Sequence, residues 1–150
     1  MKEVCENAEN FVNEILEDLN FDLEANARWE DDEGCIIDLE GEDVSFALNE
    51  NGEMLDAFET LLFQVFGREL DREHRIICDA EGFRQTRKSE LTAMAKFAAK
   101  KVREKSSPFK FGLLTPTERR MIHLALKSEE DVVTESVGEG RDRRLQVRLK

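Results

Sequence analysis

Long apolar runs are missing from this 150-residue sequence, although 40% of its residues are hydrophobic. None of its apolar segments approaches the roughly 20 residues that a membrane-spanning helix needs. Residues 1–10 are acidic and polar, unlike the basic and then apolar pattern of a secretory signal. We therefore expect a protein without a membrane segment that stays in the cytoplasm.

Cysteine is scarce and widely spaced. Cys5, Cys35 and Cys78 are odd in number, and each lies far from the others in the sequence. A zinc site needs ligands paired at short spacing, and a disulfide framework needs an even set. The sequence therefore predicts neither, and no other metal site. Cys35 and Cys78 lie in apolar, strand-like runs, so we expect both to be buried as small apolar side chains.

Recognisable catalytic patterns are also missing. The sequence contains no Ser-His-Asp order, no glycine-rich nucleotide loop and no His/Cys metal spacing. Carboxylates are abundant, but acid–base catalysis needs a pair held in different environments. A single histidine beside arginines could help to cleave RNA, but nothing supplies a second acid or base. We expect no enzyme and no cofactor.

Basic residues are almost absent from the first 60 positions. Residues 1–60 hold 2 Lys/Arg against 20 Asp/Glu, a net charge of -18, and residues 61–150 hold 20 against 14, a net of +6. Such an asymmetry indicates two different partners or tasks. Repulsion from the acidic half is screened over about 8 Å at physiological salt, so a local basic face can still bind phosphate.

Hydrophobic periodicity predicts an α+β fold. Val44, Phe46 and Leu48 alternate briefly, and Gly67 is well placed to end a helix. The expected elements are a helix over 7–19, strands over 21–29 and 35–39, a helix over 53–66, a strand over 75–80, a helix over 84–105, a strand over 109–111, a helix over 115–127 and strands over 132–136 and 143–149. The order αββαβ and then αβαββ, without a low-complexity linker, predicts two closely packed halves.

The clearest helix start lies in the second half of the chain. Thr115 is the expected N-cap, Pro116 suits the first helical position, and Glu118 completes a capping box. Arg119 and His123 are four residues apart on this helix and therefore share a face, which Lys127 continues. A row of Arg, His and Lys on one face indicates phosphate binding.

A glycine turn and an arginine-rich strand follow this helix. Glycines let a backbone approach a ligand closely, and Arg and His planes can stack on splayed bases. The predicted nucleic-acid-binding residues are Arg119, Arg120, His123, Lys127, Gly138, Gly140, Arg141, Arg143 and Arg144.

These motifs together resemble a known family. Arg119-x-x-x-His123, the capped segment before it and Thr134-Glu135-Ser136-x-Gly138-Glu139-Gly140 after it resemble the Arg-x-x-x-His (R-three-H) domain. The whole chain resembles the bacterial Jag family (KhpB, SpoIIIJ-associated protein), in which a KH domain precedes that domain. Asp79-Ala80-Glu81-Gly82-Phe83-Arg84 matches the pattern found at the junction. The extra N-terminal Jag domain and linker of many members have no counterpart here.

The resemblance implies a KH-like domain over 1–84 and an R-three-H domain over 87–150. It further implies binding of single-stranded RNA, or of single-stranded DNA, in the cytoplasm. A role in post-transcriptional control linked to cell elongation or division follows from it too, with a second KH-domain protein as a plausible partner.

One departure from the family pattern concerns the KH loop. KH domains clamp the nucleic-acid backbone with a Gly-x-x-Gly loop. Here the position holds Asn49, Glu50, Asn51 and Gly52, so the first glycine is replaced and Glu50 carries the charge that repels phosphate. We expect this half to have lost or weakened its own grip on RNA. The alternative function is a protein-interaction scaffold whose acidic surface meets a basic partner.

Simpler interpretations stand beside these hypotheses. In isolation, Arg119 and His123 could be an ordinary surface pair. Trp29 is expected in the core, and His74 has no evident partner. The basic side chains of the 84–105 helix are interpreted first as a solvated outer face: Arg87, Lys88, Lys96, Lys100, Lys101 and Arg103.

Overall fold

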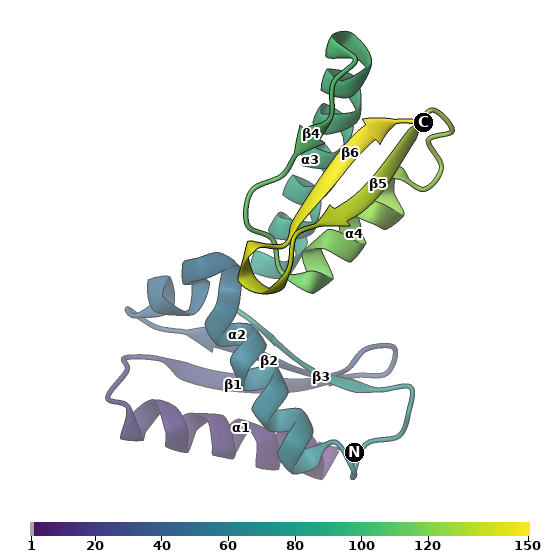
Figure 1. Ribbon diagram of the computed structural model, residues 1–150. Helices are drawn as coiled ribbons and strands as arrows, with labels where there is room; N and C mark the ends of the chain where they lie inside the picture. The colour runs from purple at the N-terminus through teal and green to yellow at the C-terminus, as the bar shows by residue number, and fades with distance from the viewer. Residues whose placement is uncertain (1) are drawn as a thin grey trace. The chain divides into compact units, whose positions relative to one another are not determined.

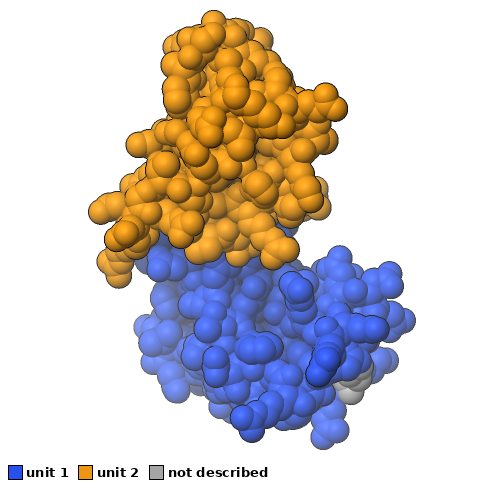
Figure 2. All heavy atoms as spheres, turned by 45° about the vertical axis from the view of Figure 1, so that its right-hand side comes forward, with its two compact units in different colours: residues 1–84 blue, residues 85–150 orange. Residues whose placement is uncertain are grey.

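The computed structural model describes residues 2–150, which form two compact units, residues 1–84 and 85–150 (Figures 1 and 2). Each unit combines helices with one three-stranded sheet and has its own hydrophobic core. The predicted α+β class is confirmed. None of the helices in the described part of the chain is long and apolar enough to cross a membrane.

The first unit has the element order αββαβ. Its elements are α1 (Lys2–Asp18), β1 (Glu24–Glu30), β2 (Gly34–Glu40), α2 (Val44–Phe66) and β3 (Arg75–Asp79). The sheet order is β1-β2-β3, with β1 and β2 forming an antiparallel hairpin and β3 pairing parallel to β2. Helix α1 begins five residues earlier than predicted, because the buried Val4 and Cys5 extend its apolar face.

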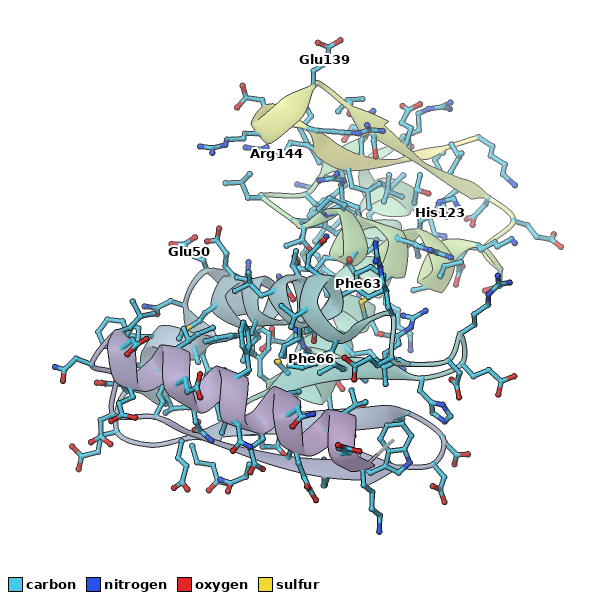
Figure 3. All side chains as sticks on the ribbon, turned by 90° about the horizontal axis from the view of Figure 1, so that it is seen from below. Glu50, Phe63, Phe66, His123, Glu139 and Arg144 are labelled. Carbon is cyan, nitrogen blue, oxygen red and sulfur yellow. A yellow bond between two sulfur atoms is a disulfide. The ribbon has the colours of Figure 1, made fainter. Side chains whose placement is uncertain are left out.

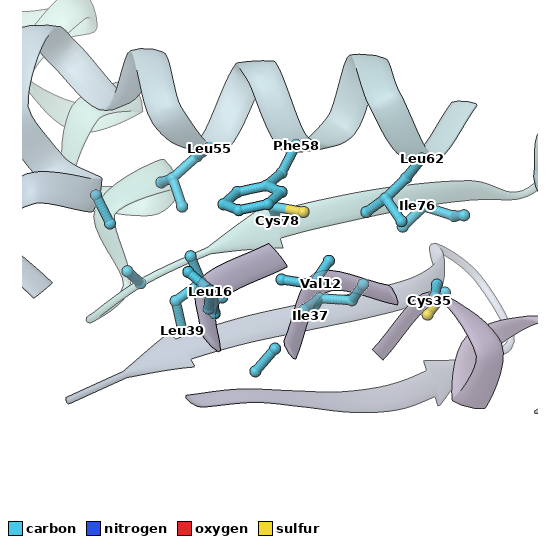
Figure 4. Close-up of a cluster of buried hydrophobic side chains, with 14 of the residues drawn as sticks. Val12, Leu16, Cys35, Ile37, Leu39, Leu55, Phe58, Leu62, Ile76 and Cys78 are labelled. Atoms are coloured by element: carbon cyan, nitrogen blue, oxygen red, sulfur yellow. The ribbon is translucent and has the colours of Figure 1, made fainter. Parts of the chain in front are cut away.

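Alternation along the strands places one face of this sheet against both helices. Figure 4 shows Val12 and Leu16 of α1 and Leu55 and Leu62 of α2 in one cluster with Ile37 of the central strand; all five are nearly inaccessible to solvent. Burying an aliphatic side chain of this size contributes about 1.5–3 kcal/mol. These contacts hold α1 and α2 in place and thereby position the segment between β2 and the second half of α2.

Helix α2 is interrupted at Asn49–Gly52. Glu50, Asn51 and Gly52 have φ values of 51°, 57° and 79°, all in the left-handed region. A Cβ at Gly52 would lie 2.6 Å from the ring of Phe83, so only glycine fits there. The segment Val44–Leu48, which lies outside the predicted elements, forms a helical turn that buries Ala47.

The Asp79–Arg84 segment joins β3 to the next helix through polar contacts. Asp79 accepts hydrogen bonds from the backbone N–H groups of Ala80 (2.8 Å) and Arg84 (3.2 Å). The Arg84 guanidinium pairs with Asp56 (2.7 Å) and Glu59 (2.8 Å) on α2. Burial raises the pKa of Glu59, although Arg84 opposes the shift. Within unit 1 this motif therefore fastens α2 to the end of the sheet.

Two predictions about unit 1 are wrong. Cys5 and Cys35 form a disulfide, with their Cα atoms 5.5 Å apart, because the start of α1 packs over β2; the 30-residue separation hides this contact. Cys78 remains a free, buried thiol as expected. His74, expected to lack a partner, contacts Asp71 (2.6 Å) and the Asp31 carbonyl (2.9 Å), and its ring lies 4.9 Å from that of Trp29.

The second unit is built from a long helix, a shorter helix and a small antiparallel sheet. Its elements are α3 (Phe83–Lys105), β4 (Phe109–Lys110), α4 (Pro116–Leu126), β5 (Val132–Val137), the 3-10 turn η1 (Gly140–Asp142) and β6 (Arg144–Leu149). Strand β6 lies in the centre, between β4 and β5. The buried residues include Leu91, Ala95, Val102, Ile122, Leu126, Leu145 and Val147.

Candidate nucleic-acid interface

The start of α4 is fixed by a complete capping box. The Thr115 hydroxyl accepts a hydrogen bond from the Glu118 N–H (3.2 Å), and the Glu118 carboxylate accepts one from the Thr115 N–H (3.0 Å). Pro116 occupies the first helical position, where no N–H is needed. The predicted helix start is therefore confirmed.

A buried ion pair ties this cap to α3. Glu118 is only 6% exposed, and its other carboxylate oxygen lies 2.6 Å from Nε of Arg87. The hydrogen bond to Glu118 raises the pKa of Arg87, and one to Glu90 adds to the shift. The interpretation of Arg87 as part of a solvated outer face is wrong, because its guanidinium turns inward to satisfy a buried carboxylate.

A cleft of about 360 Å³ lies between α4 and the strands β5 and β6. It is lined by residues of α4, by three consecutive residues of β5 and by residues at the start of β6. Its lining residues are Pro116, Arg119, Arg120, His123, Thr134, Glu135, Ser136, Arg143 and Leu145.

Both side chains of the Arg-x-x-x-His pair are held in place by hydrogen bonds. Arg119 donates from Nη1 to the Leu114 carbonyl (2.9 Å), which leaves its other N–H groups available. His123 is hydrogen-bonded through Nδ1 to the Thr134 hydroxyl. These contacts join α4 to the loop before it and to β5, and so orient the guanidinium and the imidazole at the cleft.

The charge of the cleft favours an anion. Three arginines, Arg119, Arg120 and Arg143, line it against a single carboxylate, Glu135. The Glu135 carboxylate already forms an ion pair with Arg148, with 3.1 Å between Arg148 Nε and Glu135 Oε1. Guanidinium forks and hydroxyl groups around a concave surface are well suited to phosphate oxygens.

Five of the predicted binding residues lie outside this cleft. Lys127 is the C-cap of α4, Arg141 is exposed in η1, and Arg144 donates instead to the carbonyls of Arg141 (3.0 Å) and Arg143 (3.3 Å). The structure therefore brings together Arg119, Arg120, His123 and Arg143, and leaves the remaining ones at its margin.

The other two predicted residues outside the cleft are Gly138 and Gly140, which lie in the connection between β5 and β6. Gly138 has φ of 86°, and a Cβ there would lie 2.9 Å from the Asp142 carbonyl oxygen, so the turn requires glycine. Gly140 begins η1. In Figure 3 Glu139 stands at the tip of this turn and Arg144 lies at the beginning of the next strand.

Thr134 and Ser136 join the cleft although they were not among the predicted binding residues. They pair with Val147 and Leu145 across the sheet, so they share the face that meets α4. The period-2 alternation of strands is the signal that could have indicated this, because it places Thr134 and Ser136 on the same face. The same alternation directs the side chains of Arg143 and Arg144 to opposite sides.

The altered loop in unit 1 offers a contrasting surface. Asn49, Glu50 and Asn51 are all exposed, and Gly52 is buried beneath Phe83. Figure 3 shows Glu50 at the outer edge of the unit. No group of three or more metal-ligating side chains occurs within residues 2–150.

Comparisons with known proteins agree with this geometry. Residues 89–149 match the R-three-H domain. The RNA-binding protein KhpB of Clostridium symbiosum is 28% identical over 141 residues, which cover 93% of this chain and 64% of that protein. KhpB of Bacillus subtilis (strain 168) is 28% identical over 114 residues, 75% of this chain and 55% of that protein.

The chain thus spans about three fifths of the length of these relatives. The R-three-H match contains α4, β5 and β6, the three elements that form the cleft. Both matches confirm the predicted resemblance: residues 89–149 match the R-three-H domain, and the chain is similar to the KhpB proteins over most of its length.

Proposed function

We propose that the chain binds single-stranded RNA through the cleft of its R-three-H domain. The observation that carries this proposal is the convergence of Arg119, Arg120, His123 and Arg143 on one concave surface with the Thr134 hydroxyl. The guanidinium groups pair with phosphate oxygens, and the exposed His123 ring offers a plane for a base. The name of the KhpB relatives, RNA-binding protein, supports RNA as the ligand.

Contacts of this kind position a strand without reading its sequence. Binding should therefore be tolerant of sequence and strongly dependent on salt. For single strands, log affinity falls by about 0.7 per phosphate contact for each tenfold rise in salt. Two or three arginine contacts give a slope of about -1.4 to -2.1.

The test is fluorescence anisotropy of a short labelled single-stranded RNA at two salt concentrations. Arg120→Ala/Arg143→Ala removes two exposed cleft arginines that make no ion pair within residues 2–150. We expect at least tenfold weaker binding and a flatter salt dependence, since each charge-assisted contact contributes about 1.5–3 kcal/mol. Arg141→Ala is the matched control, because it removes an exposed arginine outside the cleft. Equal losses in the two variants would contradict the proposal.

We further propose that residues 1–84 form a KH-like domain whose loop has lost its phosphate grip. The αββαβ order and the left-handed backbone of Glu50, Asn51 and Gly52 support this assignment. Glu50 opposes phosphate at the tip. A variant with Asn49→Gly and Glu50→Lys should bind RNA more tightly, and the salt slope should steepen by about 0.7. An unchanged slope would show that the loop lies off the RNA path.

A protein-interaction scaffold is the second candidate function. The large excess of acid in unit 1 favours it, with a basic or KH-type protein as the partner in the cytoplasm. This candidate predicts no RNA binding at low salt by folded protein, and a complex that is lost when the acidic surface is neutralised. The link to post-transcriptional control of cell elongation or division belongs to the RNA-binding proposal and is tested by deletion of the gene.

A further inference from the structure

A second hollow of the R-three-H unit lies apart from the arginine cleft, beside the C-terminal half of α3. It has a volume of about 310 Å³ and is lined by Phe97, Lys101, Lys105, Ser107, Pro108 and Phe109. Phe97 is 52% exposed and so presents part of its ring to solvent. Its surface thus combines aromatic rings with two lysines.

The aromatic rings of this hollow are held in place by contacts that begin at a buried ring of the core. Phe111 is 4% exposed, and the Phe109 ring meets it edge to face with centroids 5.1 Å apart. Phe97 meets Phe109 in the same manner at 5.9 Å. Phe97 is therefore the outermost of three rings that contact one another edge to face. It packs against Phe109 and is exposed to solvent over about half of its surface.

The lysines beside these rings favour an anionic partner. The Lys101 ammonium lies 5.5 Å from the centroid of the Phe97 ring, and Lys105 is exposed at the end of α3. Lys101 also pairs with Glu104 at 3.3 Å, whereas Lys105 makes no ion pair with any described residue from 2 to 150. An exposed ring flanked by ammonium groups matches a nucleotide, whose base stacks while its phosphate pairs with lysine.

We propose that this aromatic–lysine hollow stacks an unpaired base of the same RNA strand that the arginine cleft holds by its phosphates; the inference rests on the proposed RNA-binding function. On the backbone, Phe109 pairs with Val147, which is four residues from Arg143 in the sequence; this corresponds to about 13 Å along the direction of β6 at 3.3 Å per residue. Single-strand-binding domains commonly cover about 4–16 nucleotides.

Affinity measurements with two variants test the stacking. Phe97→Leu keeps an apolar side chain against Phe109 but removes the aromatic plane, and we expect about tenfold weaker binding of a 12-nucleotide RNA, the loss expected for one stacked base. Leu113→Ala is the matched control, because Leu113 is another exposed apolar residue of the same unit, 66% exposed, and is not part of the hollow. Its affinity should equal that of the wild type.

The same variants with a ribose-phosphate 12-mer that lacks bases separate stacking from general damage. The wild type and Phe97→Leu should bind this polymer equally, because it offers phosphates alone. A loss of equal size on both polymers would overturn the stacking proposal. Wild-type protein that binds neither polymer would instead overturn the proposed RNA-binding function.

A spectroscopic test does not depend on affinity. Trp29 is the single tryptophan of the chain, so Trp29→Phe combined with Phe97→Trp places the only indole in the hollow. We expect RNA to quench this fluorescence on stacking and the base-free polymer to leave it unchanged. Saturation with RNA is established by anisotropy. Unchanged tryptophan fluorescence under those conditions would contradict the stacking proposal.

Discussion

The two units of this chain are of similar architecture and opposite charge. Residues 1–84 hold 6 Lys/Arg against 25 Asp/Glu, a net charge of -19, and residues 85–150 hold 16 against 9, a net of +7. Unit 1 has a loop with three successive left-handed residues, the backbone shape that can present N–H groups to an anion, yet it carries Glu50. Unit 2 has arginines around a cleft. The two units thus differ in which feature they carry: unit 1 has the backbone shape without the positive charge, and unit 2 has the positive charge.

The largest expected effect concerns the ion pair that holds unit 2 together. Arg87→Ala leaves the buried Glu118 carboxylate uncompensated, so we expect a loss of about 3–5 kcal/mol in the free energy of unfolding. Urea denaturation followed by far-UV circular dichroism measures it. Trp29 fluorescence reports unit 1 alone, so its transition should stay near that of the wild type.

Arg103→Ala is the matched control for this prediction. Arg103 pairs with Glu129 and Asp131 on the surface and its side chain is 40% exposed, so we expect a loss of less than about 1 kcal/mol. Similar losses in both variants would show that burial does not distinguish the two pairs.

The next largest effect is confined to unit 1. Opening the Cys5–Cys35 disulfide restores freedom to a 30-residue loop of the unfolded chain. In the chain-entropy model this lowers the free energy of unfolding by about 3.6 kcal/mol. The measurement is the urea midpoint of Trp29 fluorescence, with and without a thiol reductant. Cys5→Ser should behave like the reduced wild type and respond no further to reductant; a reductant effect in that variant would point to another cause.

The smallest expected effect is a pH dependence of the free energy of unfolding that is confined to unit 1. Hydrogen bonds to the Asp31 carbonyl and to Asp71 raise the pKa of His74 above its ordinary value of 6.5. The protonated form is therefore favoured in the folded state, and its contribution to stability is complete below pH 6.5 and is lost as pH rises through the raised pKa. Trp29-monitored unfolding should weaken slightly over this range in the wild type. His74→Gln should remove that pH dependence, and its persistence would assign it to another group.

Local signals in the sequence predicted much of the fold and part of the cleft. The Thr115–Glu118 cap, the strand alternation and the Arg119/His123 spacing each depend on residues within a few positions of one another, and each is present in the structure. Local chemistry of this kind is independent of the tertiary packing around it.

The features that sequence reasoning missed are contacts between distant segments. Arg87 and Glu118 are 31 residues apart, and Cys5 and Cys35 are 30 apart. Periodicity assigns a residue to a face but not to the partner it meets there. Arg144 illustrates the limit within one strand: its charge gave no indication that its guanidinium would donate a hydrogen bond to the Arg141 carbonyl.

The cysteine arrangement has a practical consequence for labelling chemistry. In the oxidised chain Cys5 and Cys35 are bonded to each other, and burial raises the pKa of the remaining Cys78 thiol to about 12. Thiolates are the reactive species, so maleimide reagents should find no target in the native protein. A cysteine introduced at an exposed position of the R-three-H unit, which has none of its own, would then take a single dye, and energy transfer to labelled RNA could map the bound strand.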